Sequence, residues 1–320
     1  MDYLPLSDNA ARQLIDSNTI FEAYQHTRIE ANTFTGGMYW KRQGAYEYLV
    51  KTMRDNTQHR IGPRAPETEL IHANFTTRKT AAESRLRALK SALVDAERLN
   101  KALKVGRTPS IVTTLLQTLE DSGLGRHFVV VGTHALYAYE TAAAVRIVQG
   151  ALATQDLDLL WDARHRLQFV TDLDKADGSM LKLLQRVDPS FRRKDMQNET
   201  AINDRGFEVD FLRRMNTDDD NHPFRFSDDD EDLWPVQAQR ASVLTEAPRF
   251  EHMVVSTTGR MARMRTIAPQ TFVEFKTWMA AHAPHRDIAK RRRDQRQANI
   301  VQALMDEGAL LAAAGTRAPE

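Results

Sequence analysis

The chain contains 320 residues, of which 42% are hydrophobic and 27% are charged, and its formal net charge at pH 7 is +1. These values are typical of a soluble globular protein. The absence of cysteine excludes disulfides, thiolate zinc sites and cysteine nucleophiles, so a bound metal must have oxygen or imidazole ligands. We expect a cytoplasmic protein, because no apolar run reaches the roughly 18 to 20 residues of a membrane span and the N-terminus lacks the basic and apolar segments of a signal peptide.

Residues 1–125 are predicted to form a mainly helical N-terminal extension. Residues 10–31 and 80–103 are predicted to be helices, the second from the spacing of its leucines. The rest of the first 78 residues contains an aromatic-rich stretch at 38–41 and a turn-rich stretch at 62–66, and its fold is not readable in detail. A further helix is predicted to have Thr108 as its N-cap and Pro109 in its first turn.

Residues 126–215 are predicted to form a core in which strands and helices alternate. The predicted elements are, in order, a strand at 128–131, a helix at 135–144, a strand at 156–161, helical patterns at 164–169 and 179–184, and a strand at 207–212. Gly132 lies directly between the first strand and the helix.

Residues 216–320 are predicted to form a C-terminal region that begins with a polar, aspartate-rich loop at 216–232. A hairpin is predicted for residues 253–265, and two helices are predicted at 270–283 and 287–311. The fold class that follows is α+β, with a small mixed β-sheet core flanked by N-terminal and C-terminal helical regions. We therefore predict three domains with the boundaries 1–125, 126–215 and 216–320.

Two predicted strands carry acidic side chains on their polar faces. The strand period of two places Asp156 and Asp158 on one face of the first strand and Asp210 on one face of the second. Like charges at this separation repel one another unless a cation or a basic group neutralises them. Glu208 shares the face of Asp210 and is the less favoured ligand. Two solvated aspartates at a strand edge are the alternative interpretation of Asp156 and Asp158 taken alone.

Three neighbouring carboxylates suit divalent metal chemistry. Such a group can bind two Mg²⁺ or Mn²⁺ ions roughly 3.5 to 4 Å apart, an arrangement that supports in-line phosphoryl transfer. Gly132 allows the backbone to approach a phosphate closely, and Thr133 offers a hydroxyl group beside it. A purely structural cation site is the competing interpretation of the aspartates.

The order of these motifs resembles a known superfamily. Val-Val-Val-Gly132-Thr133, then Asp156-Leu-Asp158, then Val-Asp210 are similar to the core signature of the DNA-polymerase-β-like nucleotidyltransferases. Over most of its length the chain also resembles a bacterial family of uncharacterised nucleotidyltransferases with an N-terminal helical extension. The segments that carry this second resemblance are 40–41, 62–64, 67–69, 132–140 and 290–294.

The resemblance implies roles for individual residues. Asp156 and Asp158 would ligate both metal ions, and Asp210 would complete the site on the side of the nucleophile. Gly132 and Thr133 would bind the nucleotide phosphates, although glycine or serine is commoner than threonine at the second position and the methyl group of threonine adds bulk there.

Basic residues are further candidates for contact with phosphates. Lys276 stands on a predicted helix where similar proteins have a lysine or arginine near the nucleotide, and a solvent-facing lysine is the alternative. The run Arg291-Arg292-Arg293-Asp294 could extend a cationic surface toward RNA. Lys41, Arg60 and Arg64 could line the same cleft from the N-terminal region.

Two other residues are assigned packing roles ahead of functional ones. Trp40 is interpreted as a packing residue in preference to a base-stacking platform. His134 is interpreted as local structure and only secondarily as a cleft residue. Among the ten histidines, no pair has metal-ligand spacing on a convincing helix.

The sequence therefore predicts a metal-dependent nucleotidyltransferase that moves a nucleoside monophosphate from an NTP, ATP among the candidates, to a hydroxyl acceptor. An RNA or tRNA 3′ end is slightly favoured over a protein or a small molecule, and a toxin–antitoxin or defence context with an antitoxin-type partner is one hypothesis. The alternative is a non-catalytic partner protein that binds nucleotide or nucleic acid on the same fold.

Overall fold

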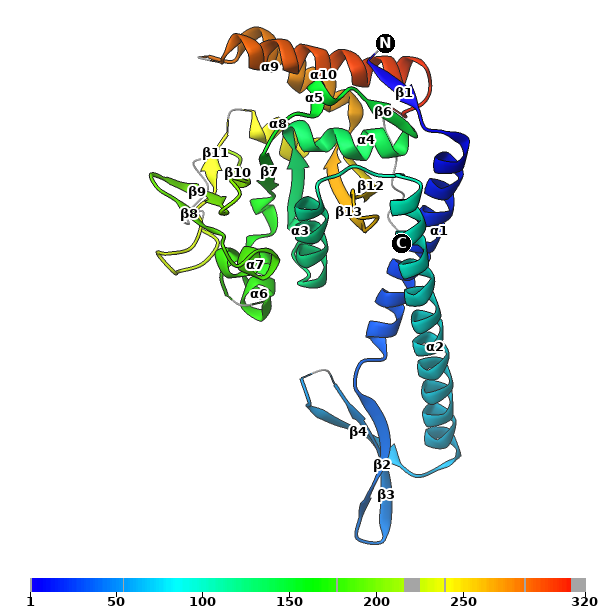
Figure 1. Ribbon diagram of the computed structural model, residues 1–320. Coiled ribbons are helices and arrows are strands. Elements are labelled where there is room, and N and C mark those ends of the chain that lie inside the picture. Colours follow the sequence, from blue (N-terminus) through cyan, green and yellow to red (C-terminus); the bar gives the residue numbers. More distant parts are fainter. Residues whose placement is uncertain are drawn as a thin grey trace. The chain divides into compact units, whose positions relative to one another are not determined.

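The computed structural model describes residues 2–53, 55–176, 178–215, 225–238, 240–284 and 286–311. Two compact units are present: a core unit of Met1–Leu14 with Asn100–Glu320, and an N-terminal unit of Ile15–Leu99 (Figure 1). The predicted domain boundaries at residues 125 and 215 both lie inside the core unit, and the three-domain division stays a prediction. In the described ranges, no helix combines the length and the apolar character that a membrane span requires.

The N-terminal unit is built from parts of two long helices and three strands between them. Helix α1 spans Asp8–Thr33 and helix α2 spans Pro66–Ala102. The strands β2 (Gly37–Gln43), β3 (Tyr46–Thr52) and β4 (Gln58–Pro63) form an antiparallel meander. The helix predicted at 10–31 is confirmed, whereas the strands fall in the segment that gave no readable pattern.

Helix α2 begins earlier than residue 80, where the sequence placed its start. Pro66 occupies the first turn, where a missing N–H costs nothing. The Thr68 hydroxyl accepts a hydrogen bond from the Ala65 N–H at 2.9 Å and lies 2.8 Å from the Pro63 carbonyl oxygen. These contacts fix the chain entry, so residues 66–79 join the helix although their hydrophobic spacing is weak.

The core unit contains a mixed sheet with the strand order β12-β13-β5-β7-β10-β9-β8, and β11 pairs with β10. Its strands are β5 (Phe128–Val131), β7 (Asp156–Trp161), β8 (Arg192–Lys194), β9 (Gln197–Ile202), β10 (Glu208–Arg213), β11 (Val236–Gln237), β12 (Arg249–Val255) and β13 (Met261–Ile267). A separate antiparallel pair joins β1 (Tyr3–Pro5) to β6 (Val145–Ile147).

Helices surround this sheet. They are α3 (Ser110–Asp121), α4 (Leu136–Ala142), α5 (Gln149–Leu152), α6 (Arg166–Ala176), α7 (Met180–Val187), α8 (Ala241–Glu246), α9 (Pro269–His282) and α10 (Ile288–Asp306). The predicted α+β class with a mixed sheet is confirmed, as are the predicted strands at 128–131 and 156–161. The hairpin predicted in residues 253–265 is also present, as β12 and β13.

Three details of the prediction were wrong. The N-cap of α3 is Pro109, while Thr108 is buried and pairs with Ser256 in an isolated β-bridge. The helix predicted at 135–144 begins instead with a 3₁₀ turn, Gly132–Ala135, which continues into α4. Strands β8 and β9 were not predicted, because residues 192–200 are polar and lack an alternating hydrophobic pattern.

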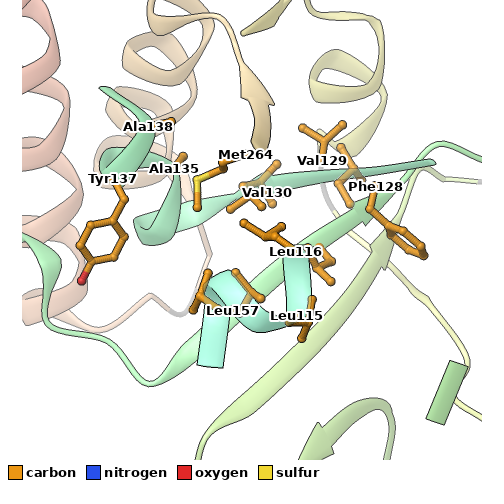
Figure 2. Close-up of a cluster of buried hydrophobic side chains, with 14 of the residues drawn as sticks. Leu115, Leu116, Phe128, Val129, Val130, Ala135, Tyr137, Ala138, Leu157 and Met264 are labelled. Atoms are coloured by element: carbon orange, nitrogen blue, oxygen red, sulfur yellow. The ribbon is translucent and has the colours of Figure 1, made fainter. Parts of the chain in front are cut away.

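The hydrophobic core is centred on β5, whose four side chains are all buried. Figure 2 shows side chains of this strand between those of neighbouring elements, with Leu115 and Leu116 from α3, Leu157 from β7 and Met264 from β13. Burial of side chains of this size contributes about 1.5 to 3 kcal/mol each. A strand covered on both faces explains why the run at 128–131 has no polar alternation.

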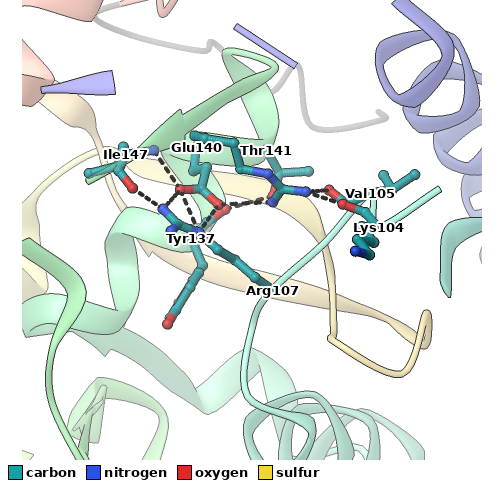
Figure 3. A network of polar contacts seen from close by, with 8 residues as sticks. Lys104, Val105, Arg107, Tyr137, Glu140, Thr141 and Ile147 are labelled. Carbon is teal, nitrogen blue, oxygen red and sulfur yellow. Dashed lines mark hydrogen bonds and ion pairs between the residues drawn. The ribbon is translucent and has the colours of Figure 1, made fainter. Parts of the chain in front are cut away.

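A buried carboxylate fixes the segment that follows α4. The Glu140 side chain accepts hydrogen bonds from Arg107 Nε at 2.9 Å and from the Ile147 N–H at 2.9 Å, with Arg146 3.5 Å away (Figure 3). Arg146 also donates to the Val105 carbonyl oxygen at 2.9 Å. Because the charge of Glu140 is compensated on two sides, this buried carboxylate holds β6 against the chain that enters α3.

The aspartate-rich loop ends in a structural contact. Residues 216–224 of the predicted loop lie outside the described residues, and the part from 225 to 232 forms turns and bends. Asp232 is buried and accepts hydrogen bonds from the Ser179 hydroxyl at 3.0 Å and from the backbone N–H groups of Met180 and Leu181 at 3.0 and 2.8 Å. The last residue of the acidic run therefore caps the N-terminus of α7, where a negative charge is favourable.

Candidate functional site

Three aspartates meet on one face of the core sheet. Strands β7 and β10 are parallel neighbours, and their register pairs Asp158 with Asp210 and Asp156 with Glu208. Carboxylate oxygens of Asp156, Asp158 and Asp210 all lie within 4.8 Å of one another. The strand pairing thus brings together the three carboxylates that the sequence placed on two separate strands.

The electrostatics of this acidic cluster favour a bound cation. Burial, together with the charges of Asp156 and Asp210, raises the pKa of Asp158 to about 7. Burial also raises the pKa of Asp210, against the hydrogen bond from Thr200, which lowers it. Carboxyl groups whose pKa values rise in this way are short of positive charge, and a divalent cation with oxygen ligands supplies it.

The neighbours of the cluster distinguish its members. The Thr200 hydroxyl donates a hydrogen bond to Asp210 at 2.6 Å and so fixes one carboxylate oxygen. Glu208 forms a half-buried ion pair with Lys194 at 2.6 Å, which compensates its charge. This pair explains why Glu208 is less suited to hold a metal than Asp210, although the two share a strand face.

Gly132 lies against the acidic cluster. Its φ angle is +68°, in the left-handed region, and a Cβ atom at this position would stand 2.1 Å from Oδ2 of Asp158. Both observations require glycine, because any side chain would be strained and would collide with the carboxylate. From the sequence, Gly132 was predicted to let the backbone approach a phosphate closely. The lack of space for a Cβ atom beside Asp158 is a separate reason for glycine at this position.

Thr133 is held in a defined orientation beside Gly132. Its hydroxyl oxygen accepts a hydrogen bond from Gln297 Nε2 at 3.1 Å, and the same amide donates to the Ala151 carbonyl oxygen at 2.6 Å. Because Gln297 uses only the acceptor capacity of the hydroxyl, its hydrogen stays available to a ligand.

A pocket of about 520 Å³ adjoins the cluster, and its volume lies in the range of small-molecule sites. Its lining includes the Gly132-Thr133 turn, Asp156 and Asp158. The pocket lining also contains four cationic residues from α9, α10 and the segment between them: Lys276, Arg286, Lys290 and Arg293. The remaining lining is largely apolar and includes Leu160, Leu212, Leu244, Phe275 and Met279.

A buried ion-pair network holds two of these cations. The Lys276 ammonium group donates to Asp294 at 2.9 Å, and Arg286 donates to the other oxygen of the same carboxylate. Burial lowers the pKa of Lys276, and burial alone would raise the pKa of Asp294, but Arg286 and Lys276 together keep it low. The solvent-facing alternative for Lys276 is therefore wrong, since only 4% of its side chain is exposed.

The basic run at 291–294 does not form one surface. Arg291 donates to the carbonyl oxygens that end α9, among them that of Ala283 at 2.9 Å. Arg292 is exposed, Arg293 lines the pocket, and Asp294 is fully buried. Helical geometry sends four consecutive side chains in different directions, so a charge run in a helix cannot act as a single patch.

A sequence profile described as a nucleotidyltransferase family matches residues 110–315, which is more than half of the chain. The chain belongs to this nucleotidyltransferase family. No curated protein and no solved structure matches it.

Family membership agrees with the geometry of the site. The acidic cluster and the whole pocket lining fall inside the matched residues, whereas the N-terminal unit lies before them. Nucleotidyltransferases act on nucleotides and generally use divalent metals, and an acidic group of three aspartates that can hold a metal ion is present. The protein is thus a transferase of this general kind, as the resemblance implied.

Other candidates from the sequence take different places in this nucleotidyltransferase. His134 is buried between the rings of Tyr137 and Phe207, and burial lowers its pKa to about 4. Trp40 packs on His72 with ring centroids 5.8 Å apart, which is the packing contact expected of it.

Lys41, Arg60 and Arg64 belong to the N-terminal unit and are not part of the pocket lining. Their expected contribution to the same cleft therefore stays a prediction.

Sequence reasoning missed Gln297 as part of the site, and it placed Asp294 only in a run that could extend a cationic surface. Both are fully buried on α10, with Val301 and Leu304 further along the same buried face. Polar residues that take the positions of a hydrophobic helix face are a signal, because burying them requires specific partners. The spacing of this buried face is present in the sequence, but the adjacent basic run at 290–293 dominated its interpretation.

Proposed function

We propose that this protein is a metal-dependent enzyme that transfers a nucleoside monophosphate from an NTP to a hydroxyl acceptor and releases pyrophosphate. The observation that carries the proposal is the pairing of opposite charges in one pocket. Two carboxylates of the acidic cluster, those of Asp156 and Asp158, line the pocket together with the cations Lys276, Arg286, Lys290 and Arg293. A metal-bound triphosphate needs both types of neighbour.

Asp156, Asp158 and Asp210 would hold the divalent cations, Mg²⁺ or Mn²⁺, and their donor set consists of oxygen atoms only, as these ions prefer. The bound ions would supply charge neutralisation and in-line alignment of the reacting groups. Thr200 keeps Asp210 in place for this role through its 2.6 Å hydrogen bond.

The cationic lining would bind the triphosphate. Lys276 and Arg286 present charge from a rigid, buried network, and the Thr133 hydroxyl has a hydrogen to donate to a phosphate oxygen. Groups fixed before the reaction stabilise developing negative charge without reorganisation. Phe275 and Met279 belong to the apolar lining, which suits the base and ribose.

For the acceptor, we propose an RNA 3′ end, that of tRNA included, ahead of a protein or a small-molecule hydroxyl. Lys290 is exposed at the pocket and supports a polyanionic acceptor. The expected cytoplasmic location, the antitoxin-type partner and ATP as a candidate substrate stay predictions.

Transfer of label tests the proposal. Purified protein is incubated with Mg²⁺ or Mn²⁺, each α-labelled NTP in turn, and cellular RNA or protein, with Asp156→Ala in parallel. We expect label in the RNA fraction for the wild type and none for the variant. No transfer from any NTP with either metal would exclude the activity. Calorimetric titration with NTP, with and without metal, would then test the non-catalytic alternative, because a pure binding protein need not bind NTP in a metal-dependent manner.

A further inference from the structure

The N-terminal unit carries a second surface with a distinct chemistry. In the β2-β3-β4 meander, cross-strand partners share a face: Tyr39 pairs with Val50, which pairs with Arg60, and Lys41 pairs with Tyr48. We call this face the tyrosine face. Its side chains are Tyr39, Lys41, Gln43, Tyr46, Tyr48, Val50, Thr52, Gln58 and Arg60.

The opposite face of the meander is used for packing. It carries Trp40, which contacts His72 of α2, and Leu49, which is completely buried. The aromatic residues of the tyrosine face are therefore not needed to attach the meander to its helix.

Aromatic rings on the tyrosine face are open to solvent. Tyr46 is 67% exposed and Tyr39 is 38% exposed. The rings of Tyr46 and Tyr48 have centroids 6.4 Å apart, and the Arg60 guanidinium carbon lies 3.1 Å from the centroid of the Tyr48 ring. Exposed tyrosines and a guanidinium already stacked on a ring are the groups on which unpaired bases stack.

The charge of this face is of one sign. Lys41 and Arg60 are its only charged side chains, and Glu47 points to the other face, where it pairs with Arg64 at 2.7 Å. Across residues 37–64 the sequence has six lysines and arginines and two acidic residues. A depression of about 290 Å³ lies on the face between Lys41, Tyr48 and Arg60, and the amides of Gln43 and Gln58 line it too.

We propose that the tyrosine face binds single-stranded RNA, with bases stacked on Tyr46 and on the Arg60–Tyr48 pair and phosphates bound by Lys41 and Arg60. Amide side chains beside the stacked rings can reach base edges, and stacking itself tolerates any sequence. A duplex would hide its bases from these rings. Protein interfaces also use tyrosine and arginine, but they are depleted of lysine, and Lys41 lines this depression.

The role of the tyrosine face in the reaction rests on the proposed function. The face would bind an RNA acceptor through residues that do not belong to the reaction site. Binding itself needs no catalysis and is measured separately.

Fluorescence anisotropy of the full-length protein tests the proposal. The probes are a labelled uridine oligonucleotide of about 12 nucleotides, within the site sizes of single-strand binding surfaces, and an RNA duplex of the same length. The variants are Lys41→Ala combined with Arg60→Ala, and Tyr46→Ala alone. The matched control is Arg85→Ala combined with Lys90→Ala, which removes the same charge from exposed positions on α2.

We expect tighter binding of the single strand than of the duplex. The Lys41 and Arg60 double variant should weaken binding at least about tenfold and reduce the salt slope by about 1.4, since each phosphate contact contributes about 0.7 for a single strand. Tyr46→Ala should weaken binding about tenfold with an unchanged slope, because stacking is lost and no charge is. The α2 control should change affinity less than about twofold.

Equal weakening by the α2 control, or equal affinity for the duplex, would overturn the proposal. So would a wild-type protein that binds neither probe, and a protein partner would then be the occupant to test. Asp156→Ala tests RNA binding by the tyrosine face independently of the transfer reaction. RNA binding that survives this substitution while transfer is lost supports both proposals, and transfer that persists sinks the proposed reaction but not the RNA surface.

Discussion

Replacement of Asp158 by asparagine is expected to stabilise the metal-free protein and to abolish metal binding. The reason is the pKa of Asp158, which is raised from 3.8 to about 7 by burial and by Asp156 and Asp210. Between about pH 4 and about pH 7 the folded state therefore holds more protons than the unfolded state. The contribution of Asp158 to the free energy of unfolding therefore falls as pH rises through this window and is constant above it.

The size of the effect follows from the shift. Each pKa unit is worth about 1.4 kcal/mol, so the full shift corresponds to about 4 kcal/mol above neutral pH. Asp158 keeps some exposure to solvent, which screens its charge, and we expect about half of this value. A gain of about 2 kcal/mol corresponds to a rise in Tm of roughly 3 °C for a chain of 320 residues.

Thermal unfolding in EDTA and in millimolar Mg²⁺, at about pH 5 and about pH 8, measures both parts of this prediction. In EDTA, the Tm of Asp158→Asn should be higher than that of the wild type at the higher pH, with a smaller difference at the lower pH. Mg²⁺ should raise the Tm of the wild type and not that of Asp158→Asn. Glu208→Gln is the matched control, because this carboxylate shares the strand face but is already paired with Lys194. A lower Tm for Asp158→Asn at the higher pH, or an equal response to Mg²⁺, would refute the reasoning.

Three further substitutions test other parts of the site and the fold. Gly132→Ala places a Cβ atom 2.1 Å from the Asp158 carboxylate, so transfer should fall at least about 100-fold while circular dichroism shows a folded protein. Asp294→Asn removes the carboxylate that pairs with both Lys276 and Arg286; the KM for NTP should rise, and the free energy of unfolding should fall by about 3 kcal/mol in urea titration. Glu140→Ala should cost about as much stability, yet the Tm increase caused by Mg²⁺ should be retained.

The sequence could predict the acidic cluster because local geometry determines most of it. Asp156 and Asp158 alternate with apolar residues, and this alternation survives in the fold as one polar face of β7. Their meeting with Asp210 depends on a parallel register between two strands separated by about 45 residues of chain, which no local pattern specifies. Superfamily resemblance supplied that step.

The N-terminal meander was not predictable for a different reason. Tyr39, Lys41 and Gln43 alternate with Met38 and Trp40, so both faces of the strand mix polar and apolar groups. The alternation of polar and apolar residues that indicates a half-buried strand is therefore absent. A sheet with one packed face and one aromatic, cationic face has this composition. The absence of a strand signal and the unusual surface chemistry therefore have the same cause.

The contacts made by helix α10 explain why the sequence predicted only some of the cations in the pocket. Asp294 organises Lys276 and Arg286, and Gln297, one turn along the same face, holds Thr133. Two of the four cations and the Thr133 hydroxyl thus depend on hydrogen bonds with side chains of one helix. A displacement of α10 would break these hydrogen bonds and would also move Lys290 and Arg293, which line the pocket from the same helix. The cationic lining and the Thr133 hydroxyl, which we propose bind a triphosphate, therefore depend together on the packing of this helix.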